Sequence, residues 1–374
     1  MYRDRHELYC CGHLLEAAIA HYKVTQNTKF LNAMIRYVKL IQTTFGPNKG
    51  QLHGYPGHEE LELALMKLYA TTRAPEHLQL ARYFVEERGQ RRDGVHFYEW
   101  EAEQRGDSPE GWFEYLQAGK PIREQPALEG HAVRAMYFLS GASDVALEVN
   151  DTTLLAAVAR QYREMVEKKM YVTYGIGSVP QWEGFGPPYD LPNDSAYCET
   201  CASIGVVLLC HRLLKWDWDV LAEHGLIAGE IADVMEGALY NAVGAGVSID
   251  GKGFFYANPL ETHGGNTHRD EWFPTSCCPP NVARLFCSLG EYQFLIKRHK
   301  TSGIPRVTVA VLLYINSEAV LNVHGRKVKI KVQTGWPWSG NTSVQFENAH
   351  DVEIELLLRN PSWNKVSPTL TLLI

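Results

Sequence analysis

The sequence lacks the features of a membrane protein or a nucleic-acid-binding protein. Its 374 residues contain no apolar run of the roughly 18 residues that a membrane span needs. The first residues, Met1–Arg5, lack the basic-then-apolar order of a secretory signal. A net charge of −7 without any basic stripe argues against a nucleic-acid partner. We therefore expect a cytoplasmic protein that acts on a small neutral or cationic molecule.

Cysteine is too scarce for a disulfide scaffold. The chain has eight cysteines, and local groups of them occur at Cys10-Cys11, at Cys198 with Cys201, and at Cys277-Cys278. Adjacent cysteines rarely bond to each other, because the ring that would form is strained. The thiols of Cys277-Cys278 are therefore free to bind a metal, to react or to pack.

What the sequence has in abundance is helical periodicity. Its content of 45% hydrophobic and 21% charged residues is ordinary for a globular protein, and its length suffices for two domains. Apolar residues recur at helical spacing in the segments His6–Tyr22, Thr28–Phe45, His58–Ala70, the stretch after Pro75, Leu128–Gly141, Thr152–Met170, Ala196–Leu214 and Leu221–Ala242.

A Gly-His pair recurs along this helical series, at Gly12-His13, Gly57-His58 and Gly130-His131. Each pair is predicted to stand at the start of a helix, and the intervals fit one helical hairpin per repeat. Alternating inner and outer helices of this kind form an α/α toroid, in which the inner helices run parallel. Their N-terminal ends would bring the three histidines to one cavity, together with Tyr197–Cys201 and Cys277-Cys278.

Beyond residue 300 the period becomes that of β-strands. We expect strands at Val307–Tyr314, Ala319–Val323, Lys327–Val332, Val352–Leu358 and Leu370–Ile374. The fold class is thus mainly α: an (α/α)6-type barrel over 1–300, followed by a partial β-sandwich domain over 301–374. Only four to five helical pairs precede the strands, so the barrel is expected to be incomplete at its N-terminal side.

Two ligand sets for a tetrahedral zinc ion can be drawn from the cysteine motifs. One is Cys198, Cys201, Cys277 and Cys278, built on a C-x2-C spacing, and the other has Glu199 in place of Cys198. Spacing favours the first set. Chemistry favours the second if the metal is catalytic, since a mixed set leaves a more labile thiolate. Four buried cysteines without a metal are the third interpretation.

The histidines and one loop carboxylate are the other candidate site residues. A single Gly-His pair is most simply a helix-start residue satisfied by a backbone carbonyl, but His13, His58 and His131 at equivalent positions indicate a shared polar pocket. Glu183 follows Trp182 in a Gly/Pro-rich loop. Desolvation beside tryptophan raises the pKa of a carboxyl, as a general acid requires, although most loop glutamates are merely solvated.

Several stretches resemble one known family. They are HGYPGHEE (53–60), YGIGSVPQWEGFGPPYDLPNDSAYCETCASIG (174–205), FFYANPLE (254–261) and CCPPNVAR (277–284). Together they are similar to glycoside hydrolase family 127, which contains retaining β-L-arabinofuranosidases, and the likeness extends from about His6 to the C-terminus. The family's (α/α)6 barrel and following β-sandwich domains agree with the helical and strand patterns above.

The resemblance implies a role for each candidate residue. The family's zinc ligands fall on Glu199, Cys201, Cys277 and Cys278, which leaves Cys198 as a bystander. Its nucleophile falls on Cys277 and its general acid/base on Glu183. Its substrate-binding residues match His13, His58, His131 and Tyr256. Trp182, Tyr197 and Trp272 are candidates to stack on sugar faces.

The implied function is a retaining hydrolase that releases L-arabinofuranose from β-L-arabinofuranosides with a zinc-bound thiolate. The chain departs from the family in starting late, in ending early within the β region and in having a short interval between Pro259 and Cys277. The alternatives are an inactive fragment with a structural zinc site that binds sugars or partners, and an isomerase or epimerase that uses the histidines. The expected partner is a small carbohydrate. A homo-oligomer is compatible with the sequence, which leaves the oligomeric state open.

Overall fold

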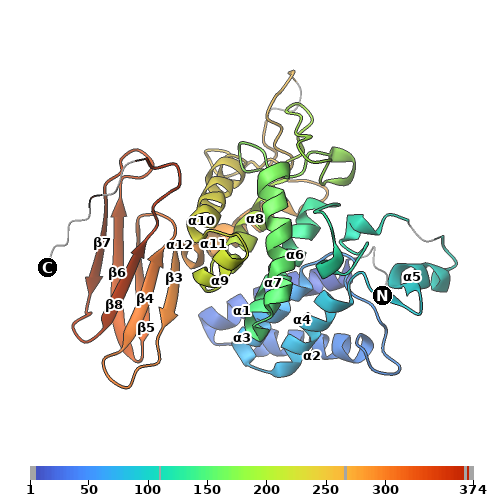
Figure 1. The fold of residues 1–374 in the computed structure, drawn as a ribbon, viewed down its shortest axis with the longest axis horizontal. Coiled ribbons are helices and arrows are strands. Elements are labelled where there is room, and N and C mark those ends of the chain that lie inside the picture. The colour runs from blue at the N-terminus through green and yellow to red at the C-terminus, as the bar shows by residue number, and fades with distance from the viewer. Residues whose placement is uncertain (1–5, 109–110, 265–267, 366–368, 370–374) are drawn as a thin grey trace.

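The computed structural model describes residues 6–108, 111–264, 268–365 and 369. Figure 1 shows a helical part that is followed by a smaller part made of strands. The helices of ten residues or more are α1 (Glu7–Thr25), α2 (Lys29–Thr44), α3 (Leu61–Thr72), α4 (Pro75–Glu87), α6 (Ala132–Val149), α7 (Thr152–Glu164), α8 (Thr200–Leu213), α10 (Ala228–Gly237) and α11 (Cys278–Cys287).

The helices alternate between an inner row and an outer row. The inner helices α1, α3, α6, α8 and α11 pack side by side in that order, and α2, α4, α7 and α10 each pack on the inner helix next to them in the chain. Every residue of α8 is buried, as expected for a helix surrounded by others. Outer helix α2 instead buries one stripe, formed by Leu31, Met34, Val38 and Ile41. The predicted arrangement of inner and outer helices is confirmed.

Three of the inner helices, α3, α6 and α8, begin later than their sequence pattern predicted. Helix α3 begins at Leu61, α6 at Ala132 and α8 at Thr200, so that the motif residues before them lie outside the helices. The prediction for Gly12-His13 was wrong, because this pair lies in the second turn of α1. Gly12 allows a close approach: a Cβ there would lie 2.6 Å from Cγ of Glu60.

Several smaller elements lie between these helices. They are β1 (Arg91–Arg92), β2 (Val95–His96), α5 (Phe97–Arg105), η2 (Phe113–Leu116), η3 (Ile122–Glu124), η4 (Met165–Lys169), η5 (Pro180–Trp182), α9 (Trp218–Glu223), η6 (Ala238–Gly244) and α12 (Gly290–Gln293). Helix α5 was missed by the sequence reasoning although it has a capping box between His96 and Glu99. Within the described ranges no helix is both long and apolar enough to cross a membrane.

The strands form two three-stranded sheets with a common core. One has the order β3 (Phe294–Arg298), β4 (Arg306–Val311), β8 (Glu353–Leu358), and the other β5 (Ser317–Val323), β6 (Arg326–Thr334), β7 (Thr342–Glu347). Their facing side chains, such as Val309 and Ile330, belong to one hydrophobic cluster, which makes the pair a small sandwich. Strands β3 and β7 were not predicted, and Leu370–Ile374 lies outside the described residues.

A buried ion-pair group joins the sandwich to the helices. Arg359, just after β8, places its two terminal nitrogens 2.6 Å from Asp233 and 2.6 Å from Glu236 on α10. The Arg359 side chain is 2% exposed. A buried cation between two carboxylates tolerates little displacement, because each charge would be left unpaired. This contact therefore fixes the sandwich against the outer side of the helical part.

Candidate active site

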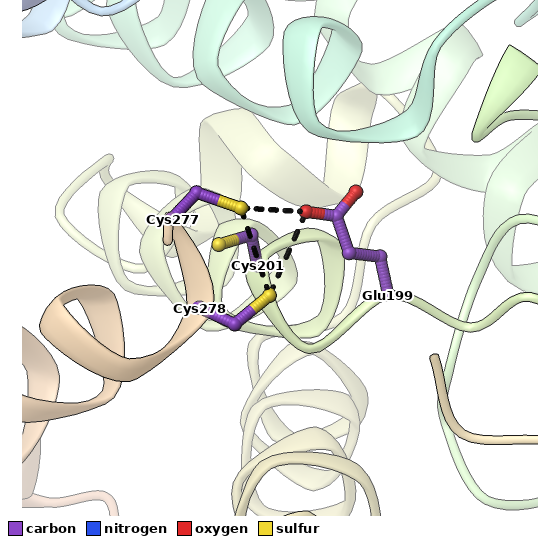
Figure 2. Close-up of side chains that lie close together, drawn as sticks. All are labelled: Glu199, Cys201, Cys277 and Cys278. Carbon is purple, nitrogen blue, oxygen red and sulfur yellow. Dashed lines mark hydrogen bonds between the residues drawn. The ribbon is translucent and has the colours of Figure 1, made fainter. Parts of the chain in front are cut away.

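Four side chains from two distant segments converge at the N-terminal ends of α8 and α11. Figure 2 shows Glu199 and Cys201 facing Cys277 and Cys278, with the carboxylate and the sulfurs directed at a common point. Sγ of Cys277 lies 3.4 Å from Oε1 of Glu199 and 3.7 Å from Sγ of Cys278. All four ligand atoms lie within 4.8 Å of one another. The structure thus assembles the second of the two predicted ligand sets.

Cys198 does not belong to this cluster. Its backbone has a φ of 42°, and its side chain packs with Tyr171 and Ala196 in a separate buried group. A Cβ on Gly175 would lie 3.0 Å from Sγ of Cys198, so this sulfur is directed at Gly175. The C-x2-C spacing is therefore not a metal-binding unit in this chain.

The polar groups of the cluster favour a thiolate at Cys277. Hydrogen bonds from the Cys201 and Cys278 thiols, together with one from the Tyr256 hydroxyl, lower the pKa of the Cys277 thiol far below its usual range. For Cys278 and Glu199, in contrast, burial is the main influence, and it raises the pKa of both groups. The least buried of the four groups thus takes the negative charge, and it is the sulfur that a substrate can reach.

The donor set fits a divalent metal ion. Glu199 is only 1% exposed, and its Oε2 is buried without a hydrogen bond to any described residue. A buried carboxylate oxygen without a partner is costly unless a cation satisfies it. Three sulfurs and one carboxylate oxygen form a four-donor set of the kind that zinc prefers in tetrahedral geometry.

Tyr256 lies in the segment after η6, and hydrogen bonds between this segment and the start of α8 hold its side chain against Cys277. The backbone N–H of Thr200 donates to the carbonyl of Tyr256 at 2.9 Å, and the Asn258 side chain donates to the carbonyl of Cys198 at 2.8 Å. These bonds fasten the FFYANPLE segment to the start of α8. As a result, the Tyr256 hydroxyl lies 3.1 Å from Sγ of Cys277.

Glu183 stands on a tight turn that is pinned to the N-terminus of α6. Val179 and Gly184 exchange backbone hydrogen bonds of 3.0 and 3.1 Å, and the Ala132 N–H donates to the carbonyl of Glu183 at 3.0 Å. Gly184 must lack a side chain, because a Cβ there would lie 2.0 Å from the carbonyl oxygen of Gly130. The carboxyl of Glu183, which is 37% exposed, is thereby fixed at the mouth of the site.

His131 orients this carboxylate. Its Nδ1 accepts the N–H of Val133 at 3.1 Å, so in the neutral ring the proton is on Nε2. Nε2 lies 3.2 Å from Oε2 of Glu183 and donates to it. Burial lowers the pKa of His131, which keeps the ring neutral at neutral pH. Ligand atoms of His131, Glu183 and Glu199 lie within 4.8 Å of one another, so this pair adjoins the cysteine cluster.

The other two predicted histidines lie in the same pocket. The ring of His58 is 5.7 Å from that of His131, and the ring of Tyr9 is 4.4 Å from both His58 and His13. Burial, followed by the charge of Arg284, lowers the pKa of His13 to about 4, so this ring too is neutral. All three histidines are thus brought together, as predicted.

Sequence reasoning missed three residues that shape this pocket. Tyr9 lies between His13 and His58, and its position four residues before His13 on one helix was the available signal. Glu60 lies 3.4 Å from Nδ1 of His13, and Arg284 lies 3.3 Å from Glu60. Both belong to quoted motifs, but nothing in the sequence shows that those motifs meet.

The aromatic candidates for sugar stacking are placed differently from one another. The ring of Tyr197 lies 6.1 Å from that of Tyr256 within the site. Trp182 adjoins Glu183 on the pinned turn, and its ring lies 5.2 Å from that of Trp112. Trp272 is 64% exposed and has no ring contact among the described residues.

Two family descriptions match the chain. The catalytic domain of the GH127 β-L-arabinofuranosidases matches residues 1–291, and the middle domain of the same family matches residues 308–373. A non-reducing end β-L-arabinofuranosidase of Bifidobacterium longum is 34% identical over 99% of this chain. The chain spans 56% of the length of that curated relative.

Solved structures give the same result. A crystal structure of a GH127 β-L-arabinofuranosidase from Geobacillus stearothermophilus T6 is 39% identical, with a TM-score of 0.84 over 96% of this chain and 56% of the other. Another GH127 β-arabinofuranosidase is 37% identical, with a TM-score of 0.75 over 91% of this chain and 48% of the other. On sequence, fold and the assembled cluster together, the chain belongs to the GH127 β-L-arabinofuranosidase family.

Proposed function

We propose that this chain is a retaining glycoside hydrolase that releases L-arabinofuranose from β-L-arabinofuranosides. The observation that carries the proposal is the meeting of a Cys277 sulfur, poised as a thiolate, with a Glu183 carboxyl held by His131. A nucleophile and a separate acid/base facing one pocket are the two parts that retaining hydrolysis requires. The relatives' names supply the sugar.

In the first step, the thiolate of Cys277 attacks the anomeric carbon and a carbon–sulfur bond forms. The bond from that carbon to the leaving oxygen breaks, and the protonated carboxyl of Glu183 gives its proton to that oxygen. In the second step, the Glu183 carboxylate takes a proton from water as the water oxygen attacks the anomeric carbon. The carbon–sulfur bond breaks, and Cys277 returns to the thiolate.

The neighbouring residues bind and orient. The Tyr256 hydroxyl donates to the sulfur of Cys277, which stabilises the charge on it before attack and as it departs. The Nε2–H of His131 holds one oxygen of Glu183 and leaves the other for the leaving group. The neutral rings of His13 and His58 offer hydrogen bonds to sugar hydroxyls without adding charge to the pocket.

Zinc is the proposed metal, and Glu199, Cys201, Cys277 and Cys278 would hold it. When bound it supplies a positive charge that keeps the thiolates deprotonated and Cys277 in a fixed position. We also propose that the protein works in the cytoplasm, where thiols such as these stay reduced.

The test is hydrolysis of a chromogenic β-L-arabinofuranoside by the wild type, by Cys277→Ser and by Cys287→Ser. Cys287 lies at the other end of α11 and is exposed, so it is the matched control. Cys277→Ser should lower kcat by on the order of 10³ or more, while Cys287→Ser should not change it. Equal turnover by all three proteins would refute the nucleophile assignment. Stoichiometric zinc without turnover of any furanoside would favour the sugar-binding alternative.

A further inference from the structure

A buried tyrosine lies between the two helices that carry the ligand cysteines. Tyr137 is on α6 and is 1% exposed. Its hydroxyl accepts a hydrogen bond of 2.8 Å from the side-chain N–H of Asn281, which follows Cys277 by one turn. Its ring adjoins Gly205, which follows Cys201 by one turn on α8: a Cβ on Gly205 would lie 3.8 Å from Cδ1 of the tyrosine. Tyr137 thus contacts both helices one turn after their cysteines.

The first turn of α11 has few backbone hydrogen bonds to hold it. Pro279 and Pro280 have no N–H, so the helical bonding of this turn begins with Asn281, whose N–H donates to the carbonyl of Cys277 at 3.2 Å. Cys277 itself lies just before the helix and is only partly buried. A cysteine pair at such a helix start depends on side-chain contacts for its position. The bond from Asn281 to Tyr137 supplies a contact from outside the helix.

The hydroxyl of Tyr137 is a partner that Asn281 needs. The side chain of Asn281 is 5% exposed, and its Oδ1 is buried without a hydrogen bond to any described residue. Burying an amide is costly unless its polar atoms are paired. An apolar side chain would be less costly at this place. The polar pair therefore indicates a role in setting geometry rather than in stability.

Tyr137 is in turn fixed by its surroundings. The guanidinium of Arg284 lies 5.9 Å from the centre of its ring, and the ring of His58 lies 6.2 Å away at an interplanar angle of 58°. The neighbouring Met136 packs tightly on α8, since a Cβ on Gly205 would lie 2.6 Å from Cβ of Met136. The tyrosine thus keeps its place relative to α8 and to the histidine pocket, and any residue bonded to it is placed with the same precision.

We propose that Tyr137 and Asn281 are positioning residues. The hydrogen bond between them sets where the cysteine pair of α11 stands relative to Cys201. It thereby sets the geometry of the metal cluster and the direction in which the Cys277 sulfur faces the substrate. The last of these consequences rests on the proposed function, because only a nucleophile needs a fixed direction of attack. A displacement of about 1 Å can lower a rate on the order of a hundredfold.

The experiment compares Tyr137→Phe, Asn281→Leu and the double variant with the wild type. Turnover of the chromogenic β-L-arabinofuranoside gives kcat and KM, and titration of the metal-free proteins with Co²⁺ gives a dissociation constant and a visible absorption spectrum. Co²⁺ binds to the donors that bind zinc, and its absorption bands depend on the coordination geometry. In each single variant kcat should fall roughly tenfold with KM nearly unchanged, the dissociation constant of Co²⁺ should rise roughly tenfold, and the bands should shift.

The double variant separates positioning from packing. Replacing both partners by apolar side chains leaves neither an unpaired amide nor an unpaired hydroxyl, so its melting temperature should recover most of what Asn281→Leu and Tyr137→Phe lose. Its kcat and Co²⁺ spectrum should remain those of the single variants, because the bond is still absent. Recovery of kcat together with the melting temperature would assign the pair a structural role only and overturn the proposal.

Tyr162→Phe is the matched control. Tyr162 is a buried tyrosine on the outer helix α7, and its hydroxyl lies 4.0 Å from Sγ of Cys210. Removing this hydroxyl should leave kcat and the Co²⁺ spectrum as in the wild type, since α7 carries none of the cluster residues. Wild-type kcat and spectrum in Tyr137→Phe, or equal changes in Tyr162→Phe, would overturn the proposal.

The Co²⁺ titration also distinguishes a failure of this proposal from a failure of the proposed function. If the wild type binds Co²⁺ but cleaves no furanoside, the proposed hydrolase fails. The spectra of the variants then decide by themselves whether the pair positions the cysteines: shifted bands support the proposal, and unchanged bands overturn it. If the wild type binds no Co²⁺, the four side chains form no metal cluster whose geometry the pair could set, and the proposal is overturned.

Discussion

Replacing Arg284 by methionine tests how the buried charges hold the site together. Arg284 lies two turns after Cys277 along α11, on the same face of the helix. Its Nη2 lies 2.6 Å from Glu16 on α1 and 3.3 Å from Glu60 just before α3. Nζ of Lys67 forms a second ion pair with Oε1 of Glu16, at 3.0 Å. One guanidinium thus links the helix that carries the cysteine pair to the elements that carry His13 and Glu60.

The size of the expected loss of unfolding free energy follows from the charge on Glu16. Burial opposes ionisation of this carboxyl, but Arg284 and then Lys67 hold its pKa at about 2, against 4.5 for a free carboxyl. With the side chain of Glu16 only 9% exposed, that difference corresponds to roughly 3 kcal/mol at neutral pH. In proteins generally, removing one partner of a buried ion pair lowers the free energy of unfolding by about 3–5 kcal/mol. We expect Arg284→Met to lose about 3 kcal/mol of unfolding free energy at pH 7.

The stability difference between Arg284→Met and wild type should change with pH in a definite direction. A carboxyl whose pKa is lowered by folding stabilises the protein fully above the pKa of the unfolded chain, and this stabilisation is lost as the pH falls towards the folded pKa. The difference between Arg284→Met and wild type should therefore be largest at neutral pH and should narrow below about pH 4.5, since the Glu16 carboxyl of the unfolded chain is protonated progressively there.

Urea unfolding of both proteins between pH 7 and pH 3.5 measures this difference. Arg91→Met is the matched control, because Arg91 pairs with Glu99 at 2.9 Å but is 49% exposed. An exposed pair of this kind should contribute under about 1 kcal/mol. A loss for Arg284→Met no larger than that of the control, or one that persists unchanged at pH 3.5, would refute the reasoning.

Three further outcomes are expected. Gly184→Ala should lower kcat at least roughly tenfold with zinc content unchanged, because a Cβ 2.0 Å from the Gly130 carbonyl displaces the turn that holds Glu183; wild-type kinetics would contradict it. Chelation should lower the melting temperature of the wild type, as seen by scanning calorimetry, but should leave that of Cys201→Ala unmoved, since the metal stabilises only the folded cluster. Arg359→Met should cost about 3–5 kcal/mol in urea unfolding, because it leaves two buried carboxylates on α10 unpaired; a loss under 1 kcal/mol would exclude a fixed sandwich.

The helical and strand periods were readable from the sequence because they reflect local physics. Helix α8 is mostly apolar and is buried on every side, as expected for an inner helix, and outer helix α2 shows one apolar stripe. The positions of helix starts were harder to predict. Apolar periodicity does not mark where the backbone turns from extended to helical, so α3, α6 and α8 were each placed several residues early.

The sequence by itself determined the layers of the fold and the short set of residues from which a metal site could be built. Between Cys198 and Glu199 the sequence left a choice: spacing favoured Cys198, the chemistry of a catalytic metal favoured Glu199, and the likeness to a family selected Glu199. The tertiary structure decided it physically: α8 begins at Thr200, so Cys198 is not on a helix face with Cys201 and turns towards Gly175 instead. The same holds for Arg284 with Glu16 and Glu60. Their contacts join segments more than 200 residues apart, and no local pattern encodes such a distance.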